Sequence, residues 1–285
     1  MPTTSINGVE LYYEEAGSGT PIVFVHEFAG DYRSWEAQMR SFSGRYRAIT
    51  FSARGYLPSQ VPEDEAAYGQ DLQVEDLKGL LDVLGIDKAH ICGLSMGSYT
   101  TLLFGLKHPD RALSLTIAGS GYGSGASREE FHAEVQQRAQ DMLDGGMSGG
   151  ADTFTLGPAR VQLQNKNPRA WAELNAMFLE HSAQGSAFTL RKVQGGRPSV
   201  FDLTEEMRAL QVPALIMLGD EDDAGMEGSL LMKRCIPRSG LHIYPRCGHT
   251  LNLEEPEMFN RSLLDFITAV DAGHWEARDP RSIVD

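Results

Sequence analysis

The sequence is poor in cysteine and has no long apolar run. Its three cysteines, Cys92, Cys235 and Cys247, are far apart and form no CxxC pair, so neither a disulfide framework nor a zinc site is indicated. No apolar stretch approaches the roughly 18 residues that would cross a bilayer. The first residues lack the basic and then apolar pattern of a secretory signal. We therefore expect a cytoplasmic protein with no membrane partner.

Positive charge is also scarce. The chain has 25 Lys and Arg against 39 Asp and Glu, which gives a formal net charge of −14 at pH 7. Nucleic acids and anionic membrane surfaces are bound by positive patches, so this balance argues against both as partners. The 285 residues, of which 41% are hydrophobic, are typical of a globular protein able to bury a large core.

Short apolar runs alternate with segments of helical periodicity along most of the chain. Strands are predicted at 9–15, 21–28, 46–52, 89–94, 112–119, 212–220 and 240–245, and helices at 31–43, 70–84, 95–108, 228–236 and 256–270. This alternation predicts an α/β fold in which helices cover both faces of a mostly parallel sheet.

The alternation breaks between residues 123 and 205. A capping box of Ser127 and Glu130 predicts the start of one helix, a second is predicted at 168–182, and glycine-rich turns are expected between them. Because these helices have apolar faces to bury, we interpret 123–205 as a helical lid inserted into a core made of 1–122 and 206–272. A polar tail without periodicity, 273–285, follows.

The stretch Gly93-Leu94-Ser95-Met96-Gly97 joins a predicted strand to a predicted helix. Such a turn strains the serine backbone, and a Cβ at either glycine would collide with the neighbouring strand or helix. The serine hydroxyl would lie beyond the carboxyl end of the sheet, where open α/β folds bind ligands. A serine is a weak nucleophile alone and needs a base, usually histidine, that is oriented by an acid.

At this point the chain resembles the α/β-hydrolase fold family, in particular its lid-bearing serine hydrolases. The resemblance rests on HEFAG, GLSMG, GDEDD and CGHTLNLEEP, each after a predicted strand, and spans nearly the whole chain. It implies a catalytic triad in the order serine, acid, histidine, here Ser95, Asp222 and His249. Asp220 and Asp223, in the same acidic turn, remain alternatives for the acid.

The resemblance also implies an oxyanion hole made by the backbone N–H groups of Phe28 and Met96. Glu27 stands where relatives usually have glycine, and its carboxylate would oppose a nearby developing anion. We favour a Glu27 side chain directed away, toward Arg33 or Arg54, over one that takes part in substrate selection.

Other residues are weaker candidates for substrate contacts. These are Glu27 and, in the lid, Trp171 and Phe178, although aromatic lid residues more often form the lid's own core.

The resemblance implies a hydrolase that cleaves an ester or related acyl bond of a small molecule through an acyl-enzyme on Ser95, without a cofactor or metal. C–C bond, amide or lactone hydrolysis by the same triad stays open. So do a lyase, a cofactor-free oxygenase and a ligand receptor with little turnover. The sequence leaves the substrate and the oligomeric state undetermined.

Overall fold

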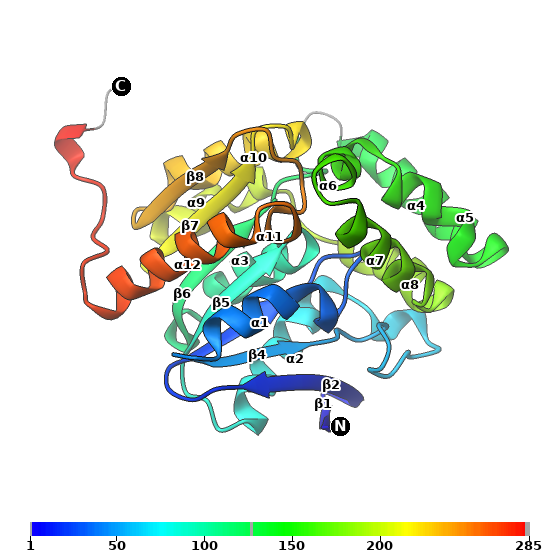
Figure 1. Cartoon of the computed structure of the whole chain (residues 1–285), viewed down its shortest axis with the longest axis horizontal. Helices are drawn as coiled ribbons and strands as arrows, with labels where there is room; N and C mark the ends of the chain where they lie inside the picture. The colour runs from blue at the N-terminus through cyan, green and yellow to red at the C-terminus, as the bar shows by residue number, and fades with distance from the viewer. Residues whose placement is uncertain (1, 126–127, 283–285) are drawn as a thin grey trace.

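The computed structural model describes residues 2–125 and 128–282, and its centre is an eight-stranded sheet in the order β1-β2-β4-β3-β5-β6-β7-β8 (Figure 1). The strands are β1 Thr3–Ile6, β2 Val9–Ala16, β3 Pro21–Val25, β4 Arg47–Phe51, β5 Ala89–Leu94, β6 Ala112–Ala118, β7 Ala214–Gly219 and β8 Ser239–Tyr244. The first two pairings, β1 with β2 and β2 with β4, are antiparallel, and the five others are parallel. The predicted mostly parallel sheet is confirmed, with β1 as an additional short edge strand.

Helices cover both faces of the sheet. In β3, Ile22 and Phe24 face one apolar cluster, while Val23 and Val25 face the other, as the alternation of a strand requires. The first cluster is closed by α1 (Glu36–Phe42) and α12 (Pro256–Asp271), and the second by α2 (Gln70–Val83), α3 (Met96–Lys107) and α10 (Asp223–Cys235). Burial on both sides explains why the central strands read as continuous apolar runs.

A helical insertion lies between β6 and β7. We define it as residues 123–205; its helices gather on one side of the molecule in Figure 1. They are α4 Arg128–Gly145, α5 Met147–Thr155, α6 Val161–Lys166, α7 Pro168–Leu179 and α8 Ala183–Phe188, and α9 Thr204–Ala209 leads out of it. Ser127 of the predicted capping box lies outside the described residues. The turns predicted around 145–153 were wrong in part, because Met147–Thr155 is helical.

The insertion shares its apolar core with the sheet. Phe131, Phe178 and Leu190 of the insertion belong to one buried cluster together with Phe28 and Tyr56 of the core. Phe28 lies 6.3 Å from Phe178, measured between ring centroids. The insertion therefore covers the segment that follows β3.

The C-terminal segment is anchored although it lacks periodicity. Trp275 packs against Phe266 of α12 with ring centroids 4.6 Å apart, and its indole N–H donates to the Arg238 carbonyl at 2.9 Å.

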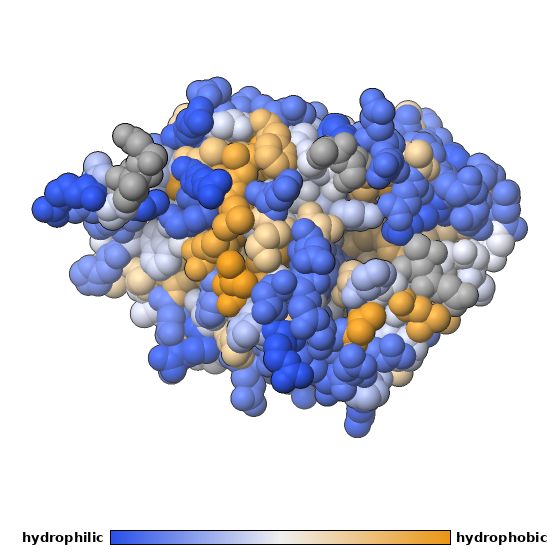
Figure 2. Space-filling view, turned by 90° about the horizontal axis from the view of Figure 1, so that it is seen from above, coloured by the Kyte–Doolittle hydropathy of each residue, from blue (hydrophilic) through white to orange (hydrophobic). Residues whose placement is uncertain are grey.

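Hydrophilic side chains cover most of the face seen in Figure 2, with hydrophobic ones gathered in patches between them. Within the described part of the chain, no helix is both long and apolar enough to cross a bilayer.

Candidate active site

Ser95 sits in a strained turn between β5 and α3. Its backbone has φ 54° and ψ −114°, which a residue with a side chain rarely adopts. A Cβ on Gly93 would lie 2.2 Å from the Gly97 carbonyl oxygen, and one on Gly97 would lie 2.1 Å from the Val25 carbonyl oxygen. Only glycine at both positions lets α3 begin directly against β3 and β5. The collisions predicted from the sequence for a Cβ at Gly93 or Gly97 are therefore confirmed.

His249 and Asp222 come together from two different loops. His249 Nδ1 lies 2.8 Å from Asp222 Oδ2, and both residues are buried. Of the two alternative acids, Asp220 accepts a hydrogen bond from the Cys247 N–H at 3.2 Å, and Asp223 is the first residue of α10. Within the described chain, Asp222 is the carboxylate of this turn that is hydrogen-bonded to His249.

The charges of this pair stabilise each other. Burial lowers the pKa of His249, but the charge and hydrogen bond of Asp222 outweigh it, so the pKa is raised above its usual 6.5. Burial likewise raises the pKa of Asp222, and His249 outweighs that effect and lowers it. Asp222 is thus ionised near neutral pH, and an ionised carboxylate only accepts, so neutral His249 carries its proton on Nδ1 and leaves Nε2 free as an acceptor.

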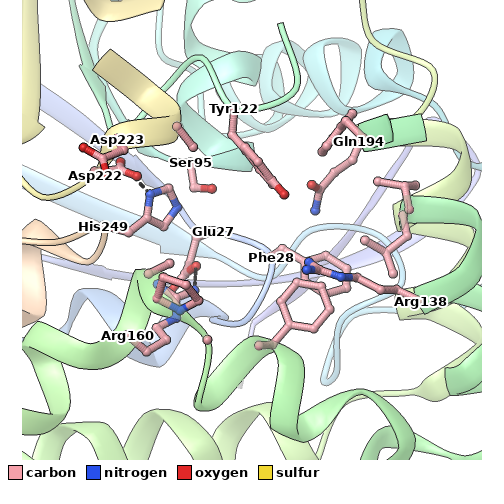
Figure 3. A pocket seen from close by; sticks show the side chains of 18 of the residues that line it. Glu27, Phe28, Ser95, Tyr122, Arg138, Arg160, Gln194, Asp222, Asp223 and His249 are labelled. Carbon is pink, nitrogen blue, oxygen red and sulfur yellow. Dashed lines mark hydrogen bonds and ion pairs between the residues drawn. The ribbon is translucent and has the colours of Figure 1, made fainter. Parts of the chain in front are cut away.

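Ser95 and His249 line one cavity of about 280 Å³. Figure 3 shows the Ser95 hydroxyl beside the imidazole, on the side away from Asp222. The cavity lies at the carboxyl ends of the strands, as ligand sites in open α/β sheets do. Its described lining also includes Glu27, Phe28, Tyr122, Phe131, Val135, Arg138, Phe154, Arg160, Leu190, Gln194, Glu221 and Asp223.

The backbone around Phe28 and Met96 fits the expected oxyanion donors. Met96 is the first residue of α3, where an N–H has no acceptor within the helix. The contact between Gly97 and Val25 brings this helix start against the end of β3, which Phe28 follows. The Met96 N–H therefore lies at the positive end of the helix dipole, and Phe28 lines the same cavity as Ser95.

His26 holds the turn before Phe28. Its Nε2 accepts from the Ala53 N–H at 3.0 Å, so the neutral ring carries its proton on Nδ1 and donates it to the Glu27 carbonyl at 2.7 Å. Complete burial lowers the pKa of His26 to about 4, so the ring stays neutral at physiological pH. Both ring nitrogens are thus used to fix the backbone.

The expected orientation of Glu27 was wrong. Arg33 binds Asp31, and Arg54 binds Asp76, whereas Glu27 lines the cavity and forms an ion pair with Arg160 of the insertion (Figure 3). Nothing in the local sequence indicates a partner 133 positions away.

Trp171 and Phe178, predicted as possible substrate contacts, are not among the described residues that line this cavity. The Trp171 indole donates to the Thr155 carbonyl at 2.7 Å, within a small apolar cluster that the insertion shares with Leu253. Phe178 is fully buried behind Phe28 and Phe154. Phe131 and Phe154 line the cavity instead, and only a three-dimensional structure distinguishes the aromatic residues that line it from those that do not.

The far part of the cavity combines apolar and paired polar groups. Arg138 forms an ion pair with Glu134 and lies 4.9 Å from the Phe154 ring centroid. Tyr122 donates to the same Glu134 at 2.7 Å.

Across the described residues there is no group of three or more His, Cys, Asp and Glu that could hold a metal ion.

Comparison with known proteins gives one family model and several relatives that match most of this chain. A family model described as alpha/beta hydrolase fold matches residues 20–256. The 2-hydroxy-6-oxononadienedioate/2-hydroxy-6-oxononatrienedioate hydrolase 1 of Dechloromonas aromatica (strain RCB) is 27% identical over 91% of each chain. The 3-oxoadipate enol-lactonase 1 of Acinetobacter baylyi (strain ATCC 33305 / BD413 / ADP1) is 26% identical over 94% of this chain and 93% of its own.

A solved structure extends this similarity to three dimensions. The thermophilic esterase from Thermogutta terrifontis, with malate bound, superposes with a TM-score of 0.84 at 27% identity, covering 94% of this chain and 97% of that one. These relatives and the structural neighbour are hydrolases. The sheet order, the strained serine turn and the family match over most of the chain lead to one conclusion: the chain belongs to the α/β-hydrolase fold family and is an enzyme of the hydrolase type.

Proposed function

We propose that the protein hydrolyses an ester or related acyl bond of a small molecule through an acyl-enzyme on Ser95. The observation that carries this proposal is the strained Ser95 turn on the same cavity as the hydrogen-bonded pair of His249 and Asp222. Strain of this kind is maintained at functional sites, where it exposes a nucleophile.

The proposed reaction starts with proton transfer. His249 Nε2 takes the proton of the Ser95 hydroxyl while Oγ attacks the acyl carbonyl. Asp222 holds the imidazole through Nδ1 and stabilises the imidazolium that forms. The proton then passes from His249 to the leaving group, and water, activated by the same imidazole, cleaves the acyl-enzyme.

The negative charge of the tetrahedral intermediate needs donors that are already in place. We assign this role to the N–H groups of Phe28 and Met96, because preorganised donors need no reorganisation during reaction. The hydrogen bonds of His26 support the Phe28 turn. Loss of one such donor typically costs a factor of about 10² to 10³ in kcat.

C–C bond hydrolysis by the same triad is the second candidate. It is favoured by the relative from Dechloromonas aromatica, whose name denotes hydrolysis of a 2-hydroxy-6-oxo dienedioate. The two candidates differ in the leaving group, which is an oxygen in an ester and a carbon in the diketone-type substrate. Parallel assays with an activated ester and a vinylogous 1,5-diketone would therefore distinguish them.

We also propose that the enzyme acts in the cytoplasm without a cofactor. All three cysteines are free and buried, which suits a reducing compartment, since disulfides persist in oxidising ones. The proposed mechanism uses only side chains and backbone groups of this chain and water.

The test of the main proposal is the Ser95→Ala variant. We expect wild-type protein to hydrolyse p-nitrophenyl acetate with a burst of p-nitrophenol and to be labelled by a fluorophosphonate, and Ser95→Ala to lose a factor on the order of 10⁴ or more in kcat. Ser41→Ala, at an exposed position of α1, is the control. Retention of turnover within about tenfold in Ser95→Ala would exclude the acyl-enzyme.

A further inference from the structure

Glu27 and Arg160 form a buried ion pair on the wall of the catalytic cavity. The Glu27 side chain is 2% exposed and that of Arg160 is 5% exposed. Glu27 precedes Phe28, one of the proposed oxyanion donors, and Arg160 ends the short helical turn Pro158–Arg160 of the insertion. Both charges act on His249, because Glu27 raises its pKa and Arg160 lowers it. The pair therefore lies close to the reacting groups.

The ion pair uses only part of its hydrogen-bonding capacity. Arg160 Nη2 donates to Glu27 Oε2. Within residues 2–125 and 128–282, three buried polar atoms of the pair have no partner: Glu27 Oε1, Arg160 Nε and Arg160 Nη1. A buried donor or acceptor without a partner costs about 1–3 kcal/mol, and more when it is charged. A ligand that supplied the missing partners would remove this cost.

The three atoms call for one donor and two acceptors. A hydroxyl group can both donate and accept, so one hydroxyl can donate to Glu27 Oε1 and accept from one of the two Arg160 groups, whose N–H bonds point in different directions. A carboxylate offers acceptors only and would leave Glu27 Oε1 without a donor while adding a second negative charge next to it. A methyl group would satisfy none of the three atoms.

The charge of the surrounding cavity also disfavours an anion at this place. Arg138, the other cation of the described lining, is already paired with Glu134. The lining carboxylates outnumber the lining cations: they are Glu27, Glu221, Asp222 and Asp223, against Arg138 and Arg160. The dioate in the name of the Dechloromonas aromatica relative would meet no unpaired lining cation here.

We propose that Glu27 and Arg160 form a subsite that binds a neutral hydroxyl group of the substrate beside the bond that is cleaved. The proposal rests on the hydrolase function proposed above and adds the substrate class, a hydroxy-substituted ester. The hydroxyl accepts from Arg160 and donates to Glu27. The subsite thus selects the substrate, and Ser95, His249 and Asp222 perform the reaction.

Two pairs of esters test the proposal, one for each side of the scissile bond. The first pair is p-nitrophenyl 3-hydroxybutyrate and p-nitrophenyl 3-methylbutyrate, and the second is 2-hydroxyethyl benzoate and propyl benzoate. Within each pair a hydroxyl replaces a methyl group of similar size. After correction for alkaline hydrolysis rates, we expect the wild-type kcat/KM to favour the hydroxyl ester by about 10- to 100-fold in at least one pair.

A paired substitution identifies the residues responsible. Glu27→Leu combined with Arg160→Met replaces the ion pair with apolar side chains of similar total volume, a change that buried pairs often tolerate. We expect this double variant to lose the hydroxyl preference while still hydrolysing the methyl esters. The matched control is Glu15→Leu with Arg47→Met, which removes a partly exposed ion pair on β2 and β4 and should keep the preference.

The outcomes separate the subsite from the proposed function. If wild-type protein hydrolyses both members of each pair equally, or if the double variant keeps the preference, the subsite proposal is overturned. If Ser95→Ala hydrolyses these esters as fast as wild type, the proposed function fails instead. Two results together support the subsite and the hydrolase function. The hydroxyl preference is lost in Glu27→Leu/Arg160→Met and kept in Glu15→Leu/Arg47→Met, and hydrolysis of the esters depends on Ser95.

Discussion

At the residue scale, His249 experiences opposing electrostatic effects from three neighbours. Burial lowers its pKa, Asp222 raises it by more, Arg160 lowers it and Glu27 raises it. The net result is a pKa above 6.5, so a substantial part of the imidazole is protonated just below neutral pH. A general base must be neutral, so the environment of His249 sets the pH at which the proposed reaction begins.

We expect the kcat/KM of ester hydrolysis to fall with decreasing pH and to reach half its maximum above pH 6.5. Below this point His249 is protonated and accepts no proton from Ser95. Arg160→Met should move the half-maximum to higher pH, and Glu27→Leu to lower pH, because the two charges act on the imidazole in opposite directions. A pH–rate profile for each variant checks this, and shifts in the same direction would contradict it.

The proposed catalytic residues were easier to predict from the sequence than the proposed substrate subsite. Ser95 could be recognised because two glycines and a strand-to-helix transition occur within five residues. Asp222 was one of three neighbouring aspartates, and its hydrogen bond to His249 needs coordinates to be seen. Glu27 could be recognised as unusual, but its partner Arg160 comes from a distant segment whose position depends on packing of the whole insertion.

At the element scale, the junction of β5 and α3 depends on close backbone contact. Gly97 packs against the carbonyl oxygens of Val25 and His26, at 2.1 and 2.7 Å from the place where a Cβ would be. Because these neighbours are backbone atoms of β3 and the segment after it, they cannot move aside as a flexible side chain could. The junction also fixes the separation of the proposed Phe28 and Met96 donors.

We therefore expect Gly97→Ala to destabilise the protein by about 1–3 kcal/mol or more, as overpacked cores do, and to lower kcat at the same time. The matched control is Gly145→Ala at the end of α4, where nothing lies within 4 Å of a new Cβ. That change should be neutral or should stabilise by about 0.4–1 kcal/mol. Urea unfolding and ester hydrolysis measure both effects, and equal behaviour of the two variants would refute the steric argument.

The elements of the core were predictable, while those of the insertion were only partly so. Ala89–Leu94 is buried at every residue and has the length of a strand, and Gln70–Val83 carries one apolar face, so both were predicted closely. Met147–Thr155 contains two glycines and few apolar residues, so its helix is not indicated by local propensity. Packing of this segment against α4 and α7 supports a helix that the sequence pattern alone did not.

At the scale of the whole molecule, the insertion and the sheet bury a common core. Phe131, Val135 and Leu190 of the insertion pack in the same cluster as Phe28 of the core, and a smaller cluster joins Trp171 to Leu253 of α11 (Leu251–Glu254). Neither part can lose its contacts without exposing apolar surface of the other. Exposure of such surface costs about 25 cal/mol per Å², which couples the two parts energetically.

We expect the insertion and the sheet to unfold in one transition. Trp35 lies under α1 on the far face of the sheet and Trp171 lies in α7, so each reports on a different part. In a variant that keeps only Trp171 and in one that keeps only Trp35, tryptophan fluorescence should follow the far-UV circular dichroism through the same urea transition. Both probes are read in the same variant, so a change in stability caused by the substitutions cancels. A Trp171 signal that changes at lower urea than the circular dichroism, with a Trp35 signal that does not, would show that the insertion opens independently of the core.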